Sequence, residues 1–205
     1  WGGFATKFLK FGEKTAAKYA DELIVLSEGT RDYFKKTYGR ETVFIPNGID
    51  VQNEKKADII TKKYGLEKDG YILFLARIVP EKGLHYLIDA FMQTDTDKKL
   101  VIAGGVSHSG EYAKQIHDMA KDDRIIFTGF VEGDELWELY YNCRMYVLPS
   151  DVEGMPISLL EAMACGCECL VSDIDTAKNV VGEYGYTFKK SDVNDLKNKL
   201  CEILG

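Results

Sequence analysis

The sequence predicts an α/β protein built on a Rossmann-like, doubly wound parallel sheet. From Tyr71 onward, short and nearly continuous apolar segments alternate with longer segments of helical character. Apolar strands of this kind are typical of a parallel sheet that helices cover on both faces. The chain has 205 residues, which is enough for one sizeable domain or for one domain and a fragment.

The regular part of the chain extends over residues 71–205. The expected strands are residues 71–76, 99–104, 124–129, 144–150, 168–173 and 185–188. The expected helices are residues 82–93, 110–121, 133–143, 156–166 and 191–204. Pro156 favours the first turn of its helix and Gly166 favours its end. This alternation is the pattern of βαβ units in a parallel sheet.

Residues 1–50 fit the regular pattern less well. They carry expected helices at 7–20 and 30–39 and expected short strands at 22–27 and 42–46. An Asn-Gly turn follows, and then residues 51–70 form a polar connector with a short helix. One domain could absorb residues 1–50, but they also have the character of the tail of a preceding amino-terminal domain.

Composition and charge exclude several classes of protein. Hydrophobic residues make up 45% of the chain, charged residues make up 29%, and the net charge is −7. This acidic balance argues against a nucleic-acid partner, which would need a basic stripe. No segment approaches the roughly 20 apolar residues of a membrane span. No signal peptide is visible, and because Trp1 stands first, we expect a processed or engineered end, or a fragment.

The cysteines indicate a reducing compartment, and we expect a cytoplasmic location. The five are Cys143, Cys165, Cys167, Cys169 and Cys201. An odd count with tight spacing does not suit a disulfide framework. A zinc site is not expected either, because the three histidines are scattered and no second cluster supplies further ligands. We interpret the segment CGCEC as small residues at a tight joint between a helix and a strand.

Ligands of doubly wound sheets bind beyond the carboxyl ends of the strands. Arg77 follows the strand at 71–76, and Lys82 with Gly83 is expected to open the next helix. Two cations beside a helix amino end suit a phosphate group, although a solvated Arg and a surface Lys are the alternative. Gly104–Gly105 follows the next strand without a G-x-G-x-x-G pattern, so we expect a plain turn there and no dinucleotide fingerprint.

The segment EGMPISLLE, at 153–161, places two carboxylates around an apolar helix start. Glu153 lies in the loop, and Glu161 lies inside the helix with its side chain leaning back toward the amino end. Their spacing corresponds to about 12 Å of helix. The two acids can therefore meet different parts of one elongated ligand, with Glu161 suited to a diol such as ribose. The alternatives are a helix-dipole acid at Glu153 and a surface acid at Glu161.

Four segments together resemble one known family. EGMPISLLEAMACG resembles the E-x7-E signature of retaining glycosyltransferases of family four, which have the GT-B fold. FLARIVPEKGLHYLIDAF, VFIPNGID and ADELIVLSEGTRDYF resemble three further segments of that family, in the family's order. Two departures stand out: Ala76 occupies a position where the family has Gly, and SDIDTAKNVVG lacks the family's Pro and Glu.

The resemblance implies one half of a GT-B fold and a role for each matching residue. Arg77 and Lys82 would hold the donor diphosphate, Glu161 the ribose, and Glu153 the transferred sugar. The residues expected to border the sugar, the phosphate and the nucleobase are Gly154, Met155, Pro156, Ile157, Phe130 and Val131. No metal and no cofactor are implied. The donor would be a nucleotide-diphosphate sugar, and residues 71–205 would form the Rossmann-like domain that binds it.

In the family, an amino-terminal domain binds the glycan or lipid-linked acceptor, and only its tail is expected here, in residues 1–50. The resemblance implies polysaccharide biosynthesis by a hexosyltransferase, with peripheral association at the inner membrane face for the full-length enzyme. One alternative is a sugar-nucleotide epimerase of the same fold, although its acid–base residues are not evident among the histidines. Another is a non-catalytic nucleotide-sugar-binding fragment that needs the missing domain.

Overall fold

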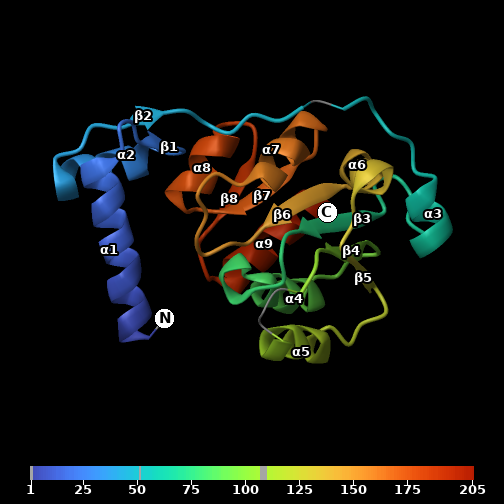
Figure 1. Cartoon of the computed structure of the whole chain (residues 1–205). Coiled ribbons are helices and arrows are strands. Elements are labelled where there is room, and N and C mark those ends of the chain that lie inside the picture. The colour runs from blue at the N-terminus through green and yellow to red at the C-terminus, as the bar shows by residue number, and fades with distance from the viewer. Residues whose placement is uncertain (1, 51, 107–109) are drawn as a thin grey trace. The chain divides into compact units, whose positions relative to one another are not determined.

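The chain divides into two compact units, Trp1–Gly48 and Ile49–Gly205 (Figure 1). The computed structural model describes residues 2–50, 52–106 and 110–205. The second unit contains a six-stranded sheet, and the first contains a two-stranded sheet. The assignment of residues 1–50 to a preceding domain stays a prediction.

The sheet of the second unit is parallel throughout. Its strands are β3 (Tyr71–Leu75), β4 (Lys99–Ala103), β5 (Ile125–Gly129), β6 (Met145–Leu148), β7 (Cys169–Ser172) and β8 (Tyr186–Phe188). Their order across the sheet is β5-β4-β3-β6-β7-β8, which is the Rossmann order 3-2-1-4-5-6 when β3 is counted as the first strand. The direction of winding reverses between β3 and β6, so the carboxyl ends of these two strands flank the switch point.

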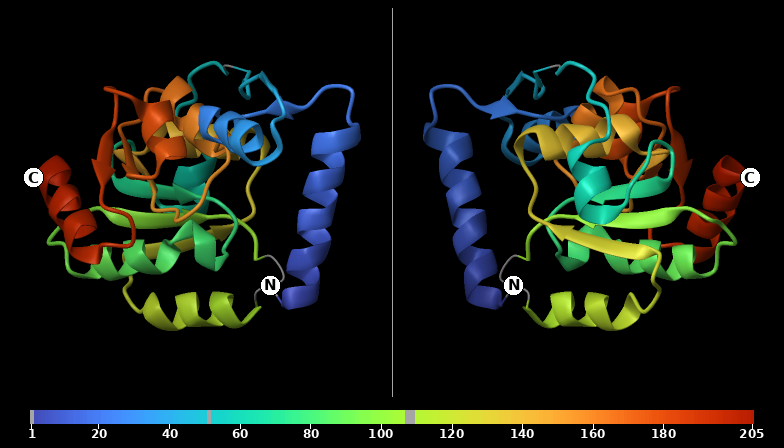
Figure 2. Two further views of the ribbon diagram at one scale, coloured as in Figure 1. Left: turned by 90° about the vertical axis from the view of Figure 1, so that its left-hand side faces the viewer. Right: turned by 90° about the vertical axis from the view of Figure 1, so that its right-hand side faces the viewer.

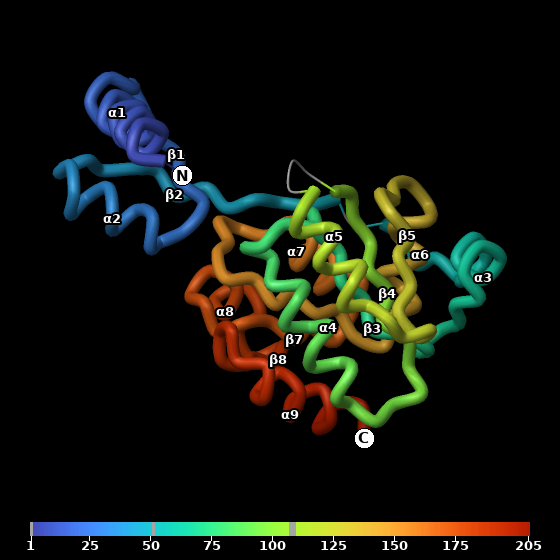
Figure 3. Tube along the Cα trace, turned by 90° about the horizontal axis from the view of Figure 1, so that it is seen from below, coloured from blue at the N-terminus to red at the C-terminus, as the bar shows by residue number. Residues whose placement is uncertain are grey.

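Helices cover both faces of this sheet, as the two side views show (Figure 2). The helices are α3 (Ile59–Tyr64), α4 (Leu84–Met92), α5 (Gly110–Met119), α6 (Gly133–Asn142), α7 (Ile157–Ala164), α8 (Asp175–Val181) and α9 (Val193–Leu204). Alternate residues of β3 supply the two cores: Ile72 and Phe74 pack with α4, α5 and α9, whereas Tyr71 and Leu73 pack with α3, α6, α7 and α8. Figure 3 shows α4 and α9 side by side in the first of these layers. The doubly wound sheet is therefore confirmed.

Two local differences from the expected elements have physical causes. Lys82 ends a short 3₁₀ turn, Pro80–Lys82, and α4 begins only at Leu84, because Gly83 between them has a left-handed φ of 66°. Helix α8 was not expected, since only Ala177 and Val181 in its seven residues are buried.

The connector also contributes to the core. Ile60 and Leu66, within the connector at 51–70, are 0% and 1% exposed in the same layer as Tyr71. These two apolar side chains therefore anchor the connector in the hydrophobic core of the second unit.

The first unit is a small α/β arrangement. Helices α1 (Gly3–Tyr19) and α2 (Glu28–Tyr38) accompany two parallel strands, β1 (Ile24–Val25) and β2 (Val43–Phe44). The hydroxyl groups of Tyr33 and Tyr38 both donate to Glu13 Oε1 at 2.6 Å, which ties α2 to α1. Ser27 caps α2 by accepting from the Thr30 amide at 3.2 Å.

Candidate active site at the carboxyl edge of the sheet

Two predicted site residues meet at the switch point of the sheet. Lys82 Nζ, from the turn after β3, lies 2.5 Å from Glu153 Oε1, in the loop after β6. Their side chains are only 16% and 6% exposed. A carboxylate buried to this degree needs a charged partner, and Lys82 supplies it. Since an ammonium group carries three N–H donors, Lys82 keeps donors for a further anion.

Ser150 holds Glu153 from the other side. Its hydroxyl donates to Glu153 Oε1 at 2.6 Å, and Ser172 Oγ in turn donates to the Ser150 carbonyl. Both serines are fully buried. No described residue bonds the second oxygen, Glu153 Oε2. The carboxylate is therefore fixed through one oxygen while the other stays available for a hydroxyl group.

The backbone around this cluster is tightly packed at Gly83. A Cβ atom added there would lie 2.0 Å from the Pro149 carbonyl oxygen. Only glycine lets the turn after β3 approach the end of β6 this closely. The close contact between the turn and the end of β6 places Lys82 beside Glu153.

Arg77 borders a separate cavity of about 150 Å³ at the ends of β3, β4 and β5. The residues that line it are Leu75, Ala76, Arg77, Ala103, Gly104, Gly105, Phe130 and Val131. Arg77 is exposed, and its side chain makes no hydrogen bond or ion pair with any residue that the structure describes. Phe130 is 76% exposed, whereas Val131 is buried. Arg77, Phe130 and Val131, which the resemblance named for donor binding, thus line one cavity, and their roles stay predictions.

The glycine pair expected as a plain turn also lines this cavity. A Cβ atom on Gly104 would lie 1.9 Å from the Ala76 carbonyl oxygen, so the ends of β3 and β4 require glycine at this position. Residues 107–109 of the predicted turn lie outside the described residues.

Helix α7 begins at Ile157, with Pro156 as the residue before its first turn. No side chain of a described residue caps this amino end, so within the described part of the chain the first-turn N–H groups remain for a ligand. Pro156 is buried, whereas Gly154 and Ile157 are exposed. Met155 has an interaction partner and is not counted among the groups left for a ligand.

Glu161 lies half-buried on α7 and is held by a residue that sequence reasoning missed. The hydroxyl group of Tyr140, on α6, donates to Glu161 Oε2 at 3.0 Å. Burial raises the pKa of Glu161, and this hydrogen bond opposes the rise. Among the described residues, no bond connects Glu161 to Glu153, Lys82 or Arg77. The two acids of the E-x7-E segment therefore belong to separate hydrogen-bond networks.

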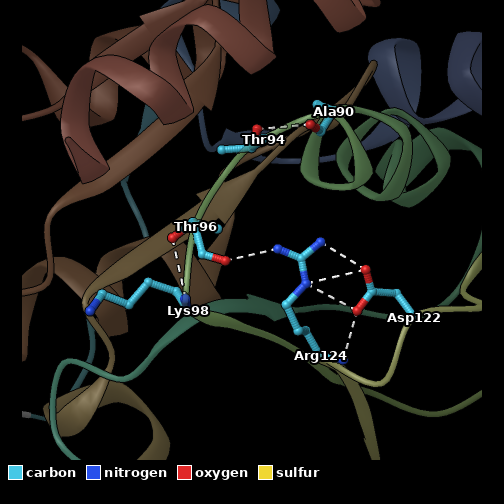
Figure 4. Close-up of polar contacts among 6 residues, drawn as sticks. All are labelled: Ala90, Thr94, Thr96, Lys98, Asp122 and Arg124. Carbon is cyan, nitrogen blue, oxygen red and sulfur yellow. Dashed lines mark hydrogen bonds and ion pairs between the residues drawn. The ribbon is translucent and has the colours of Figure 1, made fainter.

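The opposite edge of the sheet contains an arginine with a full set of partners (Figure 4). Arg124, which directly precedes β5, donates through Nε and Nη2 to Asp122 at 3.0 and 2.7 Å and through Nη1 to the Thr96 carbonyl at 2.8 Å. Its guanidinium carbon also lies 4.8 Å from the ring centroid of Phe91. The bond with Arg124 lowers the pKa of Asp122. These contacts hold the chain together at the amino edge.

Among the described residues, no group of three or more His, Cys, Asp or Glu side chains could hold a metal ion. No helix in residues 2–50, 52–106 and 110–205 has the length and apolar character needed to cross a bilayer.

Residues 56–205 match the sequence profile of the family described as Glycosyl transferases group 1. The chain belongs to this family. The family resemblance drawn from the sequence segments is confirmed by this match.

Two curated relatives of this chain are bacterial sugar transferases. The serotype-specific mannosyltransferase WbdA of Escherichia coli is 33% identical over 149 residues, which cover 69% of this chain and 18% of WbdA. The N,N'-diacetylbacillosaminyl-diphospho-undecaprenol alpha-1,3-N-acetylgalactosaminyltransferase of Campylobacter jejuni is 26% identical over 204 residues, which cover 93% of this chain and 53% of that enzyme. The chain therefore spans about half of the second relative and less of the first.

Solved structures confirm the fold. Anabaena Alr3699/HepE, in complex with UDP and glucose, superimposes with a TM-score of 0.84 at 23% identity, over 96% of this chain and 57% of that one. WaaG, a glycosyltransferase involved in lipopolysaccharide biosynthesis, has a TM-score of 0.82 at 17% identity, over 99% of this chain and 59% of its own. The Rossmann-like half of a GT-B fold is thus established.

Proposed function

We propose that the second unit binds a nucleotide-diphosphate sugar at the carboxyl edge of its sheet. The chain would be the donor half of a hexosyltransferase that passes the sugar, with retention, to a glycan or lipid-linked acceptor. Two observations carry this proposal: the Lys82–Glu153–Ser150 cluster at the switch point, and the cavity that Arg77 borders at the ends of β3, β4 and β5. The two cations would bind the diphosphate, the fixed carboxylate would bind the sugar, and the small cavity would hold the nucleobase.

Arg77 and Lys82 are assigned to the diphosphate. Arg77 has an unused guanidinium fork, which suits a phosphate group, and Lys82 is oriented by Glu153 while keeping two N–H donors. Negative charge grows on the leaving diphosphate in the transition state, so donors fixed in advance are expected to supply most of the rate enhancement. No metal ion is required in this scheme.

The carboxylates are assigned to hydroxyl groups of the donor. Glu153 Oε2 would accept from the transferred sugar, because Oε1 is occupied by Lys82 and Ser150. Glu161 Oε1 would accept from the ribose, because Oε2 is occupied by Tyr140. The backbone of residues 154–157 would lie between them, near sugar and phosphate. Phe130 and Val131 would border the nucleobase.

The chain alone is expected to bind donor but to transfer sugar slowly or not at all. It spans 53% of the Campylobacter relative and 57% of the HepE structure, so acceptor binding is assigned to residues beyond this chain. Cytoplasmic location and peripheral membrane association of a whole enzyme stay predictions.

Calorimetry of the full chain with UDP, GDP and their sugars tests the proposal. We expect saturable heat with one nucleotide and about a tenfold or greater loss of affinity in Lys82→Ala, because a charge-assisted contact is removed. Lys62→Ala is the matched control, since that lysine pairs with Asp58 on exposed α3. Absence of heat with every donor, or equal affinities in the two variants, would contradict the proposal.

A further inference from the structure

Two thiol groups from different elements are in contact in the second unit. Cys143 ends α6, Cys167 lies between α7 and β7, and their Sγ atoms are 3.6 Å apart. Both thiols donate to one acceptor, the Tyr140 carbonyl oxygen, at 3.3 and 3.0 Å. The shared acceptor fixes both sulfur atoms on one side of α6, so their proximity does not depend on exposed, mobile side chains.

A cavity of about 400 Å³ gives access to this pair. Cys143, Cys165 and Cys167 line it, together with Arg144 and Glu168, which immediately precede β6 and β7. The cavity therefore lies at the amino edge of the sheet, away from Lys82 and Glu153. Because its volume is of the size that small-molecule sites have, a reagent such as a short peptide disulfide can approach the sulfur atoms.

We propose that Cys143 and Cys167 form a modification site, at which exchange with a low-molecular-weight disulfide joins their sulfur atoms. Metal binding is disfavoured, because the described residues offer no third ligand. Two thiols in contact, from segments 24 residues apart, are instead the arrangement that closes to an intramolecular disulfide with little backbone movement.

The exchange balances with oxidised glutathione as the oxidant. The thiolate of Cys167, the less buried of the two, attacks one sulfur of glutathione disulfide and releases one glutathione. The thiolate of Cys143 then attacks Cys167 Sγ and releases the second glutathione. Two protein thiols become one disulfide, and one glutathione disulfide is reduced to two thiols that take up the two protons.

The environment of Cys143 makes the second step of the exchange slow near neutral pH. A hydrogen bond to Cys167 and burial raise the pKa of Cys143. Only the thiolate attacks, so the rate of this step should rise about tenfold per pH unit below the pKa of Cys143. Cys201 is exposed on α9 and should react faster, but only to the mixed disulfide.

The site also adjoins the proposed donor site. Tyr140 holds the two thiols through its carbonyl oxygen and Glu161 through its hydroxyl group. A cross-link between α6 and the α7–β7 loop therefore borders Glu161. The modification itself does not depend on the donor assignment, and its test requires no donor.

The test is mass mapping of the full chain after incubation with oxidised glutathione at pH 7, 8 and 9. After alkylation of the remaining thiols, trypsin cleavage at Arg144 separates the peptide of Cys143 from that of Cys167. We expect these peptides to be linked, with two hydrogens lost, at a rate that rises with pH. Cys165→Ser should keep the link, whereas Cys143→Ser and Cys167→Ser should abolish it.

Two results would overturn the proposal. One is glutathionylation of Cys201 without any internal disulfide, measured in the unmutated chain, whose folding is not in question. The other is a disulfide that persists in Cys167→Ser, because it would use Cys165 or Cys169 instead.

Discussion

The two edges of the six-stranded sheet use their charged side chains in different ways. At the amino edge, Arg124 is bonded to Asp122 and to the Thr96 carbonyl, and Arg144 is bonded to Glu168 and to the Ile203 carbonyl. At the carboxyl edge, the Arg77 side chain makes no hydrogen bond or ion pair with a described residue.

The contrast extends to the carboxylates. Asp122, at the amino edge, has a pKa lowered by Arg124, whereas Glu161, on α7, has a pKa raised by burial. Charges at the amino edge satisfy one another and stabilise the fold. At the carboxyl edge, Lys82 and Glu153 form an ion pair, whereas the Arg77 side chain bonds no described residue, and a cation of this kind is a candidate for ligand binding.

The largest effect should come from the close approach at the carboxyl edge. In Gly83→Ala, the new Cβ would meet the Pro149 carbonyl oxygen at 2.0 Å in a residue with φ of +66°. We expect a loss of about 3 kcal/mol or more in the free energy of unfolding, measured by urea denaturation. Gly133→Ala is the control, because its φ is +61° but nothing lies within 4 Å of the new atom. That control should cost about 1 kcal/mol, and equal losses would show that the approach is unimportant.

Replacing Arg77 and Arg124, in turn, by alanine tests the contrast between the carboxyl edge and the amino edge of the sheet. Arg77→Ala should weaken donor binding about 10- to 100-fold with an unchanged unfolding free energy, since it removes only ligand contacts. Arg124→Ala should lower the unfolding free energy by about 1–2 kcal/mol with unchanged affinity, since its partners lie within the chain. Calorimetry and urea denaturation of both variants provide the measurement. Equal effects of the two variants on either quantity would remove the distinction between the edges.

A smaller effect concerns the pH dependence of stability. A carboxyl group whose pKa is raised by folding stabilises the folded state in acid, and this contribution is lost as pH rises through the raised pKa. Glu161→Gln should therefore gain stability relative to the unmutated chain as pH rises from below the ordinary value of 4.5 toward neutrality. The groups that face Glu161 are Tyr140 from α6, Tyr146 from β6 and Cys165 from the end of α7. All three are neutral in this range.

Thermal melts of both proteins at pH 4 to 8 measure this difference. Donor affinity should fall about tenfold in the same variant, because a neutral amide oxygen accepts less strongly than a carboxylate. A stability difference that is constant with pH would contradict the assignment.

Features governed by local pattern were predictable from the sequence. The apolar segments predicted the six strands, and the rule that parallel strands end at one edge placed Arg77 and Phe130 at the same edge, while Val131 came from the family resemblance alone. The turn at Lys82 was wrongly placed in a helix, because the left-handed Gly83 is imposed by Pro149, a residue distant in the sequence.

Features that depend on remote partners were missed. Tyr140 and Glu161 are 21 residues apart, and nothing in either segment indicates that their side chains meet. Ser150 was noticed only as the end of a strand, although it shares Glu153 with Lys82. The cysteine segment was interpreted as a plain joint, because Cys143, the contact of Cys167, lies on another element.

The most direct test of the central claim is a titration of the ¹⁵N-labelled chain with UDP and GDP, followed by amide chemical shifts. If the carboxyl edge is the donor site, the amides of Gly104, Gly105, Gly154 and Ile157 should shift with one saturable affinity, while those of Asp122 and Arg124 stay unchanged. Shifts that gather at Asp122 and Arg124, or no saturable shift with either nucleotide, would contradict the account.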